Sequence, residues 1–290
     1  MDLTKKSVKA KRPCADGFRW FLRRHEQGGD YQQLLDELVA DGRIDDACWL
    51  LDQFGPNDSV LTVDAIDAEA IVFAGTLEVR GAIDVATVVH VGRTIRAGGG
   101  IRAGRAIVAG EDIVSAGGIR CEGRLDADGT IKADWGIEVD GSIRCGEDLR
   151  AAWDLQCGDA LTARGNVFVG QSVSVQGAVQ CGKTLRAGGD ITSPESIRAG
   201  SGIECGGRIE CGMHLEADWG IRAGAAIVAE GAIKAGESLF AREEIRAGAG
   251  YGVYAGLNVR VDAWESSAQV RAGARPDGLM SGWWAGAALV

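Results

Sequence analysis

One string in the sequence has the letters and spacing of a phosphate-binding loop. Residues 177–184 read Gly-Ala-Val-Gln-Cys-Gly-Lys-Thr, the G-x-x-x-x-G-K-T pattern in which backbone N–H groups and a lysine hold nucleotide phosphates. That chemistry requires the loop to open a helix, whose N-terminus attracts the phosphates. Val179 and Leu185 instead belong to an aliphatic repeat that continues past Thr184. The sequence therefore does not favour nucleotide binding.

Three histidines could transfer protons near neutral pH. His25 lies in a helical segment, and we expect His90 and His214 to point outward because each adjoins an inward-facing aliphatic residue. None has an obvious catalytic partner. Eight cysteines are present without a C-x-x-C pair, and the chain is not a short secreted one. We expect no enzyme activity, no metal site and no cofactor.

Most of these histidines and cysteines lie within a six-residue repeat, which must therefore position them. From Ile71 to Leu257 every sixth residue is Ile, Leu or Val, except Tyr251, with no insertion or deletion. Two residues later the side chain is usually small, and Gly commonly follows. Internal repetition of this kind indicates a solenoid.

The repeat assigns an inside and an outside. Residues i and i+2 of a strand face the same side, so each hexad predicts a short strand with one large and one small inward side chain. Glycine would form the corners, where φ could be positive. Three hexads close an 18-residue coil, which predicts a mainly β fold, a three-sided β-helix. The small inward position also accounts for six of the cysteines (Cys121, Cys145, Cys157, Cys181, Cys205 and Cys211) as packed hydrophobes.

The order of large before small residues carries a family resemblance. Residues 99–104 read Gly-Gly-Ile-Arg-Ala-Gly and residues 141–146 read Gly-Ser-Ile-Arg-Cys-Gly. This Gly-x-Ile-x-Ala run resembles the bactofilin type of polymer-forming protein, over residues 71–260 only. The resemblance implies a right-handed three-sided β-helix that assembles end to end into filaments without nucleotide. Hexapeptide acyltransferases place the small residue two before the aliphatic one, and they use a histidine and often a loop that leaves the coils.

One outer face is predicted to carry basic residues. Outward residues 18 apart should stack into a ladder that contains Arg96, Lys132, Arg150, Arg186 and Arg222. Trp135 and Trp153 are also 18 apart, and they should stack beside Lys132 and Arg150 with cation–π contacts. This face could bind an acidic protein or nucleic acid. The alternative is a solvated face whose cations have acidic neighbours.

The N-terminal region departs from the repeat. Residues 1–25 hold eight basic and two acidic residues, whereas the whole chain has a net charge of −10. We expect residues 1–13 to be a disordered basic arm that contacts an anionic partner, or simply a solubilising segment. Residues 14–57 show three amphipathic stripes with sensible stops, which predicts a small helical domain or cap. Its Trp20 and Trp49 should pack in a core or against the open end of the rod.

The β-helix is expected over residues 58–262, with residues 263–290 as a C-terminal cap or assembly tail. Trp264, Trp283 and Trp284 should cap the exposed end of the solenoid or serve as assembly contacts. No signal peptide or membrane span is evident, so we expect a cytoplasmic protein. The predicted function is a non-enzymatic scaffold that associates with itself. The alternatives are an accessory or immunity-type module that binds another protein on the ladder face, and an acyltransferase.

Overall fold

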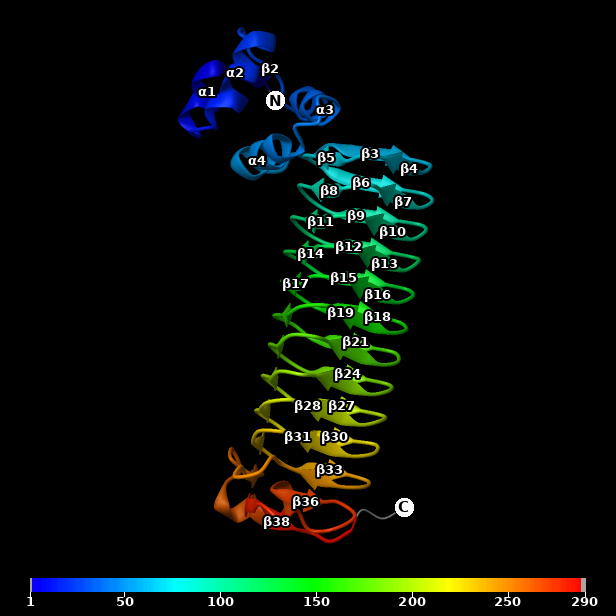
Figure 1. Cartoon of the computed structure of the whole chain (residues 1–290), viewed down its shortest axis with the longest axis vertical. Helices are drawn as coiled ribbons and strands as arrows, with labels where there is room; N and C mark the ends of the chain where they lie inside the picture. Colours follow the sequence, from blue (N-terminus) through cyan, green and yellow to red (C-terminus); the bar gives the residue numbers. More distant parts are fainter. Residues whose placement is uncertain (1, 288–290) are drawn as a thin grey trace.

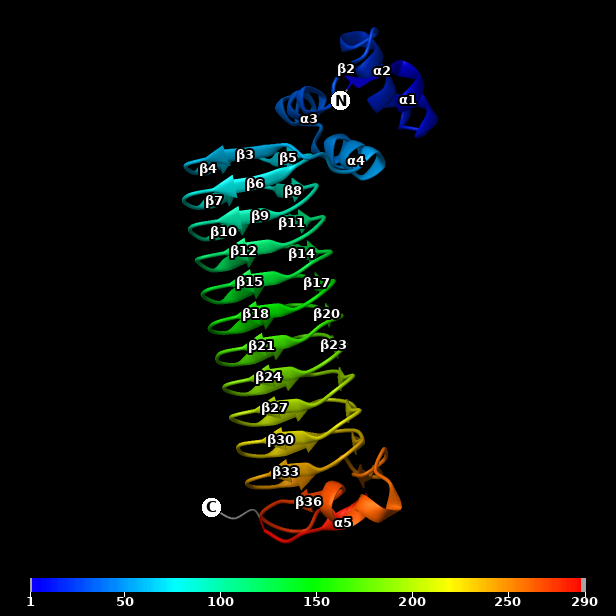
Figure 2. The same ribbon diagram turned by 180° about the vertical axis from the view of Figure 1, so that it is seen from behind.

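The computed structural model describes residues 2–287 and consists of a helical head on a long three-sided rod (Figures 1 and 2). The head, residues 2–54, contains β1 (Asp2–Leu3), α1 (Lys5–Ala10), α2 (Ala15–Arg24), β2 (Gly29–Asp30), α3 (Tyr31–Ala40) and α4 (Ile44–Phe54). Near the far end of the rod lie the short helices η1 (Val261–Ala263) and α5 (Trp264–Ser267). The three expected amphipathic helices are thus present as α2, α3 and α4.

The rod is built from three parallel sheets, which the chain visits in turn. Sheet I contains β3 (Val60–Val63), β6 (Thr76–Val79), β9 (Ile95–Ala97), β12 (Ile113–Ser115), β15 (Ile131–Ala133), β18 (Leu149–Ala151), β21 (Val167–Val169), β24 (Leu185–Ala187), β27 (Ile203–Cys205), β30 (Ile221–Ala223), β33 (Leu239–Ala241), β36 (Gln269–Arg271) and β38 (Trp283–Trp284). Sheet II contains β4 (Ile66–Ala68), β7 (Ile83–Val85), β10 (Ile101–Ala103), β13 (Ile119–Cys121), β16 (Ile137–Val139), β19 (Leu155–Cys157), β22 (Val173–Val175), β25 (Ile191–Ser193), β28 (Ile209–Cys211), β31 (Ile227–Ala229) and β34 (Ile245–Arg246). Sheet III contains β5 (Ile71–Phe73), β8 (Val88–Val91), β11 (Ala106–Ala109), β14 (Arg124–Ala127), β17 (Ile143–Cys145), β20 (Leu161–Ala163), β23 (Val179–Cys181), β26 (Ile197–Ala199), β29 (Leu215–Ala217), β32 (Ile233–Ala235), β35 (Val253–Tyr254) and β37 (Leu279–Ser281).

The predicted fold class is confirmed: the rod is a parallel β-solenoid with 18-residue coils. Ile101, for example, pairs with Ile83 on one side and with Ile119 on the other. The large and small inward residues form one continuous core, and Leu155 and Cys157 within it are 0% and 2% exposed. Large aliphatic side chains therefore stack on large ones along the rod, and each coil covers the apolar face of the next. The right-handed winding implied by the family resemblance stays a prediction.

The corner glycines serve a different purpose from the one expected. Positive φ values occur in the head and in the last coils, and none occurs between residues 56 and 249. At Gly98 a Cβ atom would instead overlap the carbonyl oxygen of Arg80, one coil earlier. Glycine at such corners thus permits close approach between coils rather than a left-handed backbone.

Polar side chains in the last position of a corner also bridge the coils. The N–H of Asn166 donates to Asp148 Oδ1 at 2.8 Å, and the N–H of Thr184 donates to Asn166 Oδ1 at 3.3 Å. At another corner the N–H of Ala232 donates to His214 Nδ1 at 3.1 Å. These side chains satisfy backbone donors that the sheets leave free.

The repeat begins earlier and ends earlier than the sequence predicted. Leu61 and Ile66 continue it toward the N-terminus, through two steps of five residues, and they pair with Leu77 and Ile83. At the other end Tyr251 and Leu257 were assigned to the interior, and this was wrong: they are 52% and 53% exposed. Two extra residues in the turn before β35 place Val253, not Tyr251, beside Ile233.

Although the regular six-residue spacing ends early, the β-helix itself continues further along the chain than predicted. Sheets I and III continue through β36, β37 and β38, so the β-helix extends beyond residue 262 into the segment expected to be a cap or tail. Residues 288–290 of that expected segment lie outside the described residues. The insertion that holds η1 and α5 lies beside these last coils.

The N-terminal residues are not the disordered arm that the sequence predicted. Thr4 caps α1 through a reciprocal pair of hydrogen bonds with Ser7, and β1 pairs with β2. Leu3 and Val8 are 2% and 3% exposed within the head core. Burial of these two apolar side chains orders the segment, although its lysines stay at the surface.

Candidate interaction surfaces

The outer face of sheet I brings the predicted basic residues into one row. The pairing register aligns Arg96 with Val114, Val114 with Lys132, and Lys132 with Arg150. Farther along, Phe168 separates Arg150 from Arg186, and Glu204 separates Arg186 from Arg222. The row, which we call the ladder face, continues to Phe240 and Arg271.

Three of these cations form ion pairs on the same chain. Lys132 Nζ lies 2.9 Å from Asp134, and Arg150 Nη2 lies 3.2 Å from Asp148. Arg186 pairs with Glu204 at 3.6 Å. These are exposed ion pairs, so each is worth little stability, but they neutralise much of the row. Such pairing is typical of a solvated face.

The cation–π contacts differ in their aromatic partners from those expected. Arg150 lies over the ring of Phe168 at 5.3 Å, and Arg222 lies over Phe240 at 4.8 Å. No such contact with Trp135 or Trp153 occurs among residues 2–287. The phenylalanines face the same side as the arginines, whereas the tryptophans occupy a corner.

Trp135 and Trp153 project together from the corner between sheets I and II. They are 63% and 55% exposed, and the N–H of Trp153 donates to the carbonyl of Trp135 on the preceding coil at 3.4 Å. The two residues therefore occupy equivalent positions on adjacent coils, whereas the stacking of their side chains stays a prediction. Sequence reasoning missed Trp219, which is 59% exposed at the corner between sheets III and I. The six-residue register places Trp219 at a corner position, so its exposure could have been predicted from the sequence.

The tryptophans of the head lie in a core that the head shares with Val72 and Ala74 of the first coil. Trp20 is 6% exposed, and Trp49 packs against the same cluster. Trp20 Nε1 donates to Asp41 Oδ2 at 2.6 Å, which fixes α2 on the end of α3. Neither residue is among those that pack on the core of the rod.

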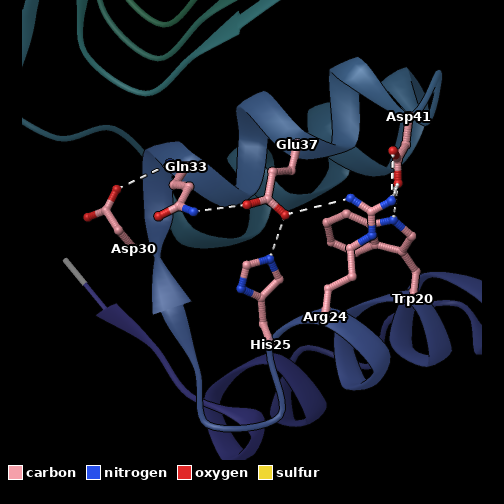
Figure 3. A network of polar contacts seen from close by, with 7 residues as sticks. All are labelled: Trp20, Arg24, His25, Asp30, Gln33, Glu37 and Asp41. Carbon is pink, nitrogen blue, oxygen red and sulfur yellow. Dashed lines mark hydrogen bonds and ion pairs between the residues drawn. The ribbon is translucent and has the colours of Figure 1, made fainter.

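A polar network joins α2 to α3 (Figure 3). His25 Nε2 lies 2.8 Å from Glu37 Oε2, and Gln33 donates to Glu37 Oε1 at 2.9 Å. Arg24 donates to Asp41 at 3.0 Å. The hydrogen bond from His25 holds the pKa of Glu37 below its usual value. His25 thereby has a structural partner.

The head contacts the rod at the first strands of sheet III. The side chain of Gln32 donates to the carbonyl of Val72 at 3.1 Å and accepts from the N–H of Ala74 at 3.0 Å. The Gln32 side chain thus pairs with backbone groups at the free edge of β5, as the backbone of a further strand would. On the side of the rod His90 is 8% exposed and lies 3.4 Å from Asp52 of α4. Burial lowers the pKa of His90.

The head leaves two of the three sheet edges uncovered. Sheets I and II end at β3 and β4, and no described strand pairs beyond them. Val60 is 59% exposed, and Leu61, Val63 and Ile66 are half-buried although they continue the core. The N-terminal end of the rod therefore presents unpaired backbone groups around a section of apolar core.

The C-terminal tryptophans have three different environments. Trp284 is half-buried against the core of the rod, whereas Trp283 beside it is 44% exposed. The ring of Trp264 lies beside Gly256, where an added Cβ would be 2.8 Å from it. Trp284 therefore closes the end of the core together with Leu279 of β37, which also packs against it.

The basic surface of the head lies on α1 and its flanks. Lys5, Lys6 and Lys9 are exposed, and Lys11 Nζ lies 5.5 Å from the centre of the Phe54 ring. α1 lies at the far side of the head from the rod (Figure 1). The lysines can therefore meet an outside partner without disturbing the head–rod joint.

The residues whose types could support catalysis make contacts that hold the fold together. All three histidines contact named groups of the fold, at Glu37, Asp52 and the N–H of Ala232. Residues 182–184 form a corner between β23 and β24, so the phosphate-loop string opens no helix. Within residues 2–287 no cluster of three potential metal ligands occurs. Burial raises the pKa of Cys205 and of Cys211 to about 11.

No helix in the described part of the chain combines the length and apolarity that a bilayer crossing requires.

The head has a counterpart among known families: residues 1–54 match the model of the YdhT N-terminal domain. The match ends at Phe54, where α4 ends, so it covers the head and none of the rod. No curated protein and no solved structure matches the chain.

Proposed function

We propose that this protein is a non-enzymatic structural scaffold of the cytoplasm that associates with itself through the N-terminal end of its rod. The observation that carries this proposal is the pair of uncovered edges at β3 and β4. Unpaired strand edges invite pairing with another chain, and proteins that remain single normally cover or charge them. Here the head covers the edge of β5 alone.

The chemistry of the interior supports a structural role. The buried thiol of Cys157 and the corner side chains of Asp148 and His214 are used in packing and in hydrogen bonds between coils. The free cysteines are typical of a reducing compartment. The lysines of α1 supply a second contact, with an anionic partner, by charge attraction.

The backbone geometry provides a specific test. The N–H of Leu77 points toward the next coil, where it donates to Thr94, so the N–H of Glu78 points the other way. Because Thr62 aligns with Glu78, its N–H faces the free edge. Thr62→Pro removes this donor and places a ring at the edge, whereas Thr62→Val retains the donor.

We expect light scattering to show concentration-dependent association for the wild type and Thr62→Val, and smaller assemblies for Thr62→Pro at the same concentrations. Circular dichroism of all three proteins checks that the rod is intact. Electron microscopy should show particles longer than one rod, which is roughly 60 Å for thirteen strands. A wild type that remains monomeric at every concentration would overturn the proposal.

The alternative function is capture of another protein on the ladder face. The observation that favours it is the pair of arginine–phenylalanine contacts, since arginine and aromatic residues are enriched at interfaces. Loss of partner binding in Arg150→Ala and Arg222→Ala, with self-association unchanged, would favour this alternative over the scaffold.

A further inference from the structure

The corner between sheets I and II carries a ridge and a notch side by side. The ridge consists of Trp135 and Trp153 on adjacent coils, both more than half exposed. The two preceding coils have glycine at the corresponding positions, Gly99 and Gly117, each followed by another glycine. Large aromatic side chains therefore lie next to a stretch of corner without side chains.

The fold does not require glycine throughout this notch. The column that contains Gly100, Gly118 and Gly136 carries Asp154, Ser172, Asp190 and Arg208 in later coils. A Cβ on Gly100 would meet its nearest neighbour at 3.3 Å, and so would a Cβ on Gly118. Their φ values are not in the left-handed region. At Gly99 and Gly117 a Cβ would lie 3.0 Å and 2.7 Å from backbone atoms of the preceding coil, so those two glycines allow close approach of the coils. Gly100 and Gly118, the second glycine of each pair, are the positions with more room for a side chain.

A shallow groove continues from the notch onto sheet II. It has a volume of about 420 Å³ and is lined by the three column glycines together with Arg102, Arg120 and Glu138. Arg120 and Glu138 form an exposed ion pair at 3.2 Å. The groove is therefore apolar along the corner and charged along its outer side.

We propose that two copies of this chain pair side by side and antiparallel, with the tryptophan ridge of each seated in the glycine notch of the other. Coils are evenly spaced, so a two-fold axis that sets Trp135 opposite Gly117 also sets Trp153 opposite Gly99. The contact is self-complementary, as a two-fold interface must be. Exposed indoles are the side chains most often found at the energetic centre of interfaces.

Charges on the groove agree with the same axis. Glu138 lies on the coil of Trp135, and Arg120 lies on the coil of Gly117. The axis therefore sets Glu138 of one copy opposite Arg120 of the second copy, in both directions. Gln156 meets Arg102 in the same way. Opposite charges thus face each other, which favours this register over a shifted one.

The surroundings leave the ridge accessible. The head contacts β5 and β8 of sheet III, through Gln32 and through Asp52. Sheet III is the side of the three-sided rod opposite the corner of sheets I and II. A second copy can thus approach the ridge without displacing the head.

The test is sedimentation equilibrium of the full chain. In the Thr62→Pro background, which removes the end pairing, we expect a dimer, and a dissociation constant raised at least about tenfold when Trp135→Ser/Trp153→Ser is added. Trp219→Ser removes an equally exposed tryptophan from another corner, and it should leave the dimer unchanged. Gly118→Gln keeps both tryptophans but fills the notch, so it should weaken the dimer as well.

Cross-linking then tests the register. In a Cys14→Ser background, Glu138→Cys and Arg120→Cys proteins should form a disulfide-linked pair when mixed, and neither should do so alone. A double tryptophan variant that dimerises as tightly as the wild type would overturn the side-by-side pairing.

This inference deepens the proposed self-association and rests on it, but the two can fail separately. Pairing through the corner doubles the width of the particle in electron micrographs, whereas pairing through β3 and β4 doubles its length. Particles that are long and never wide, and that Thr62→Pro disperses, would overturn the corner pairing and support the end pairing. A strictly monomeric wild type would overturn both.

Discussion

At the residue scale, the inward positions of the rod tolerate little change because each side chain is enclosed by its own coil and by the coils on either side. Leu155 stacks between Ile137 and Val173 and is 0% exposed. A carboxylate there would lose its hydration without gaining a partner.

Leu155→Asp should therefore destabilise the rod by more than about 4 kcal/mol, or prevent folding altogether. Gln156→Asp, at the adjacent exposed position, is the matched control and should have little effect. Thermal unfolding followed by circular dichroism measures the difference. Equal stability of the two variants would contradict the inside-outside assignment.

The cysteines allow a second prediction at this scale. Cys14 is exposed, the six rod cysteines are buried, and burial raises the pKa of Cys48 to about 11. Because the thiolate is the reactive form, native protein at pH 7 should react with a maleimide at Cys14 alone. Denatured protein should react at all eight cysteines, and mass spectrometry counts the labels. Rapid labelling of a rod cysteine would show that the coils open.

At the scale of elements, the joint between head and rod combines an apolar contact, in which Val72 and Ala74 pack in the core of the head, with a few polar side chains. Gln32 closes the edge of β5, and α4 covers His90. The neighbouring Gln33 contacts Glu37 within the head, so it offers a control that leaves the joint alone.

Gln32→Ala should expose the edge of β5 without unfolding the rod. Hydrogen exchange at the N–H of Ala74, which donates to Gln32, should become faster. In Gln33→Ala that exchange should be unchanged. If Ala74 exchanges at the same rate in both variants, Gln32 does not hold the joint.

His90 makes this joint sensitive to pH. Burial lowers the pKa of His90, Arg124 opposes its protonation, and Asp52 partly offsets these effects. A histidine with a lowered pKa disfavours the charged form, so the docked state loses stability as pH falls below the ordinary value of about 6.5. The protection of amides in α4 and β8, measured against the intrinsic exchange rate at each pH, should therefore decrease as pH falls below about 6.5. His90→Gln should remove that dependence, and an unchanged pH profile in this variant would contradict the prediction.

At the scale of the whole molecule, the solenoid behaves as a stack in which each coil depends on its neighbours. Trp284 covers the last part of the core. Its removal should affect the adjacent coils more than distant ones, because contacts in a solenoid are made only between successive repeats.

Trp284→Ala should speed hydrogen exchange in β33, β36 and β38 and leave β12 and β15 nearly unchanged. Trp283→Ala, at the exposed neighbouring position, is the control. Uniform acceleration along the rod would show that the whole solenoid unfolds as one unit rather than from its end.

The sequence by itself determined the solenoid and the direction of most rod side chains. Each coil repeats the environment of the one before, so spacing alone predicts that Ile101 is buried and Arg150 exposed. The ladder face and the stacked tryptophans follow from the same register. Even so, the sequence could not show that Arg150 lies over Phe168, because that choice depends on the rotamers of neighbouring side chains.

Tertiary structure alone decided the ends and the joints. The contacts of Gln32 with Ala74 and of Asp52 with His90 join segments that no repeat relates, and nothing in local spacing encodes them. The order of residues 2–10 depends on burial of Leu3 and Val8 against the other helices of the head. Likewise, β3 and β4 remain free edges because the head docks on β5 and leaves them uncovered. Repetition fixes the interior of a solenoid, whereas its ends are set by contacts between segments of different kinds.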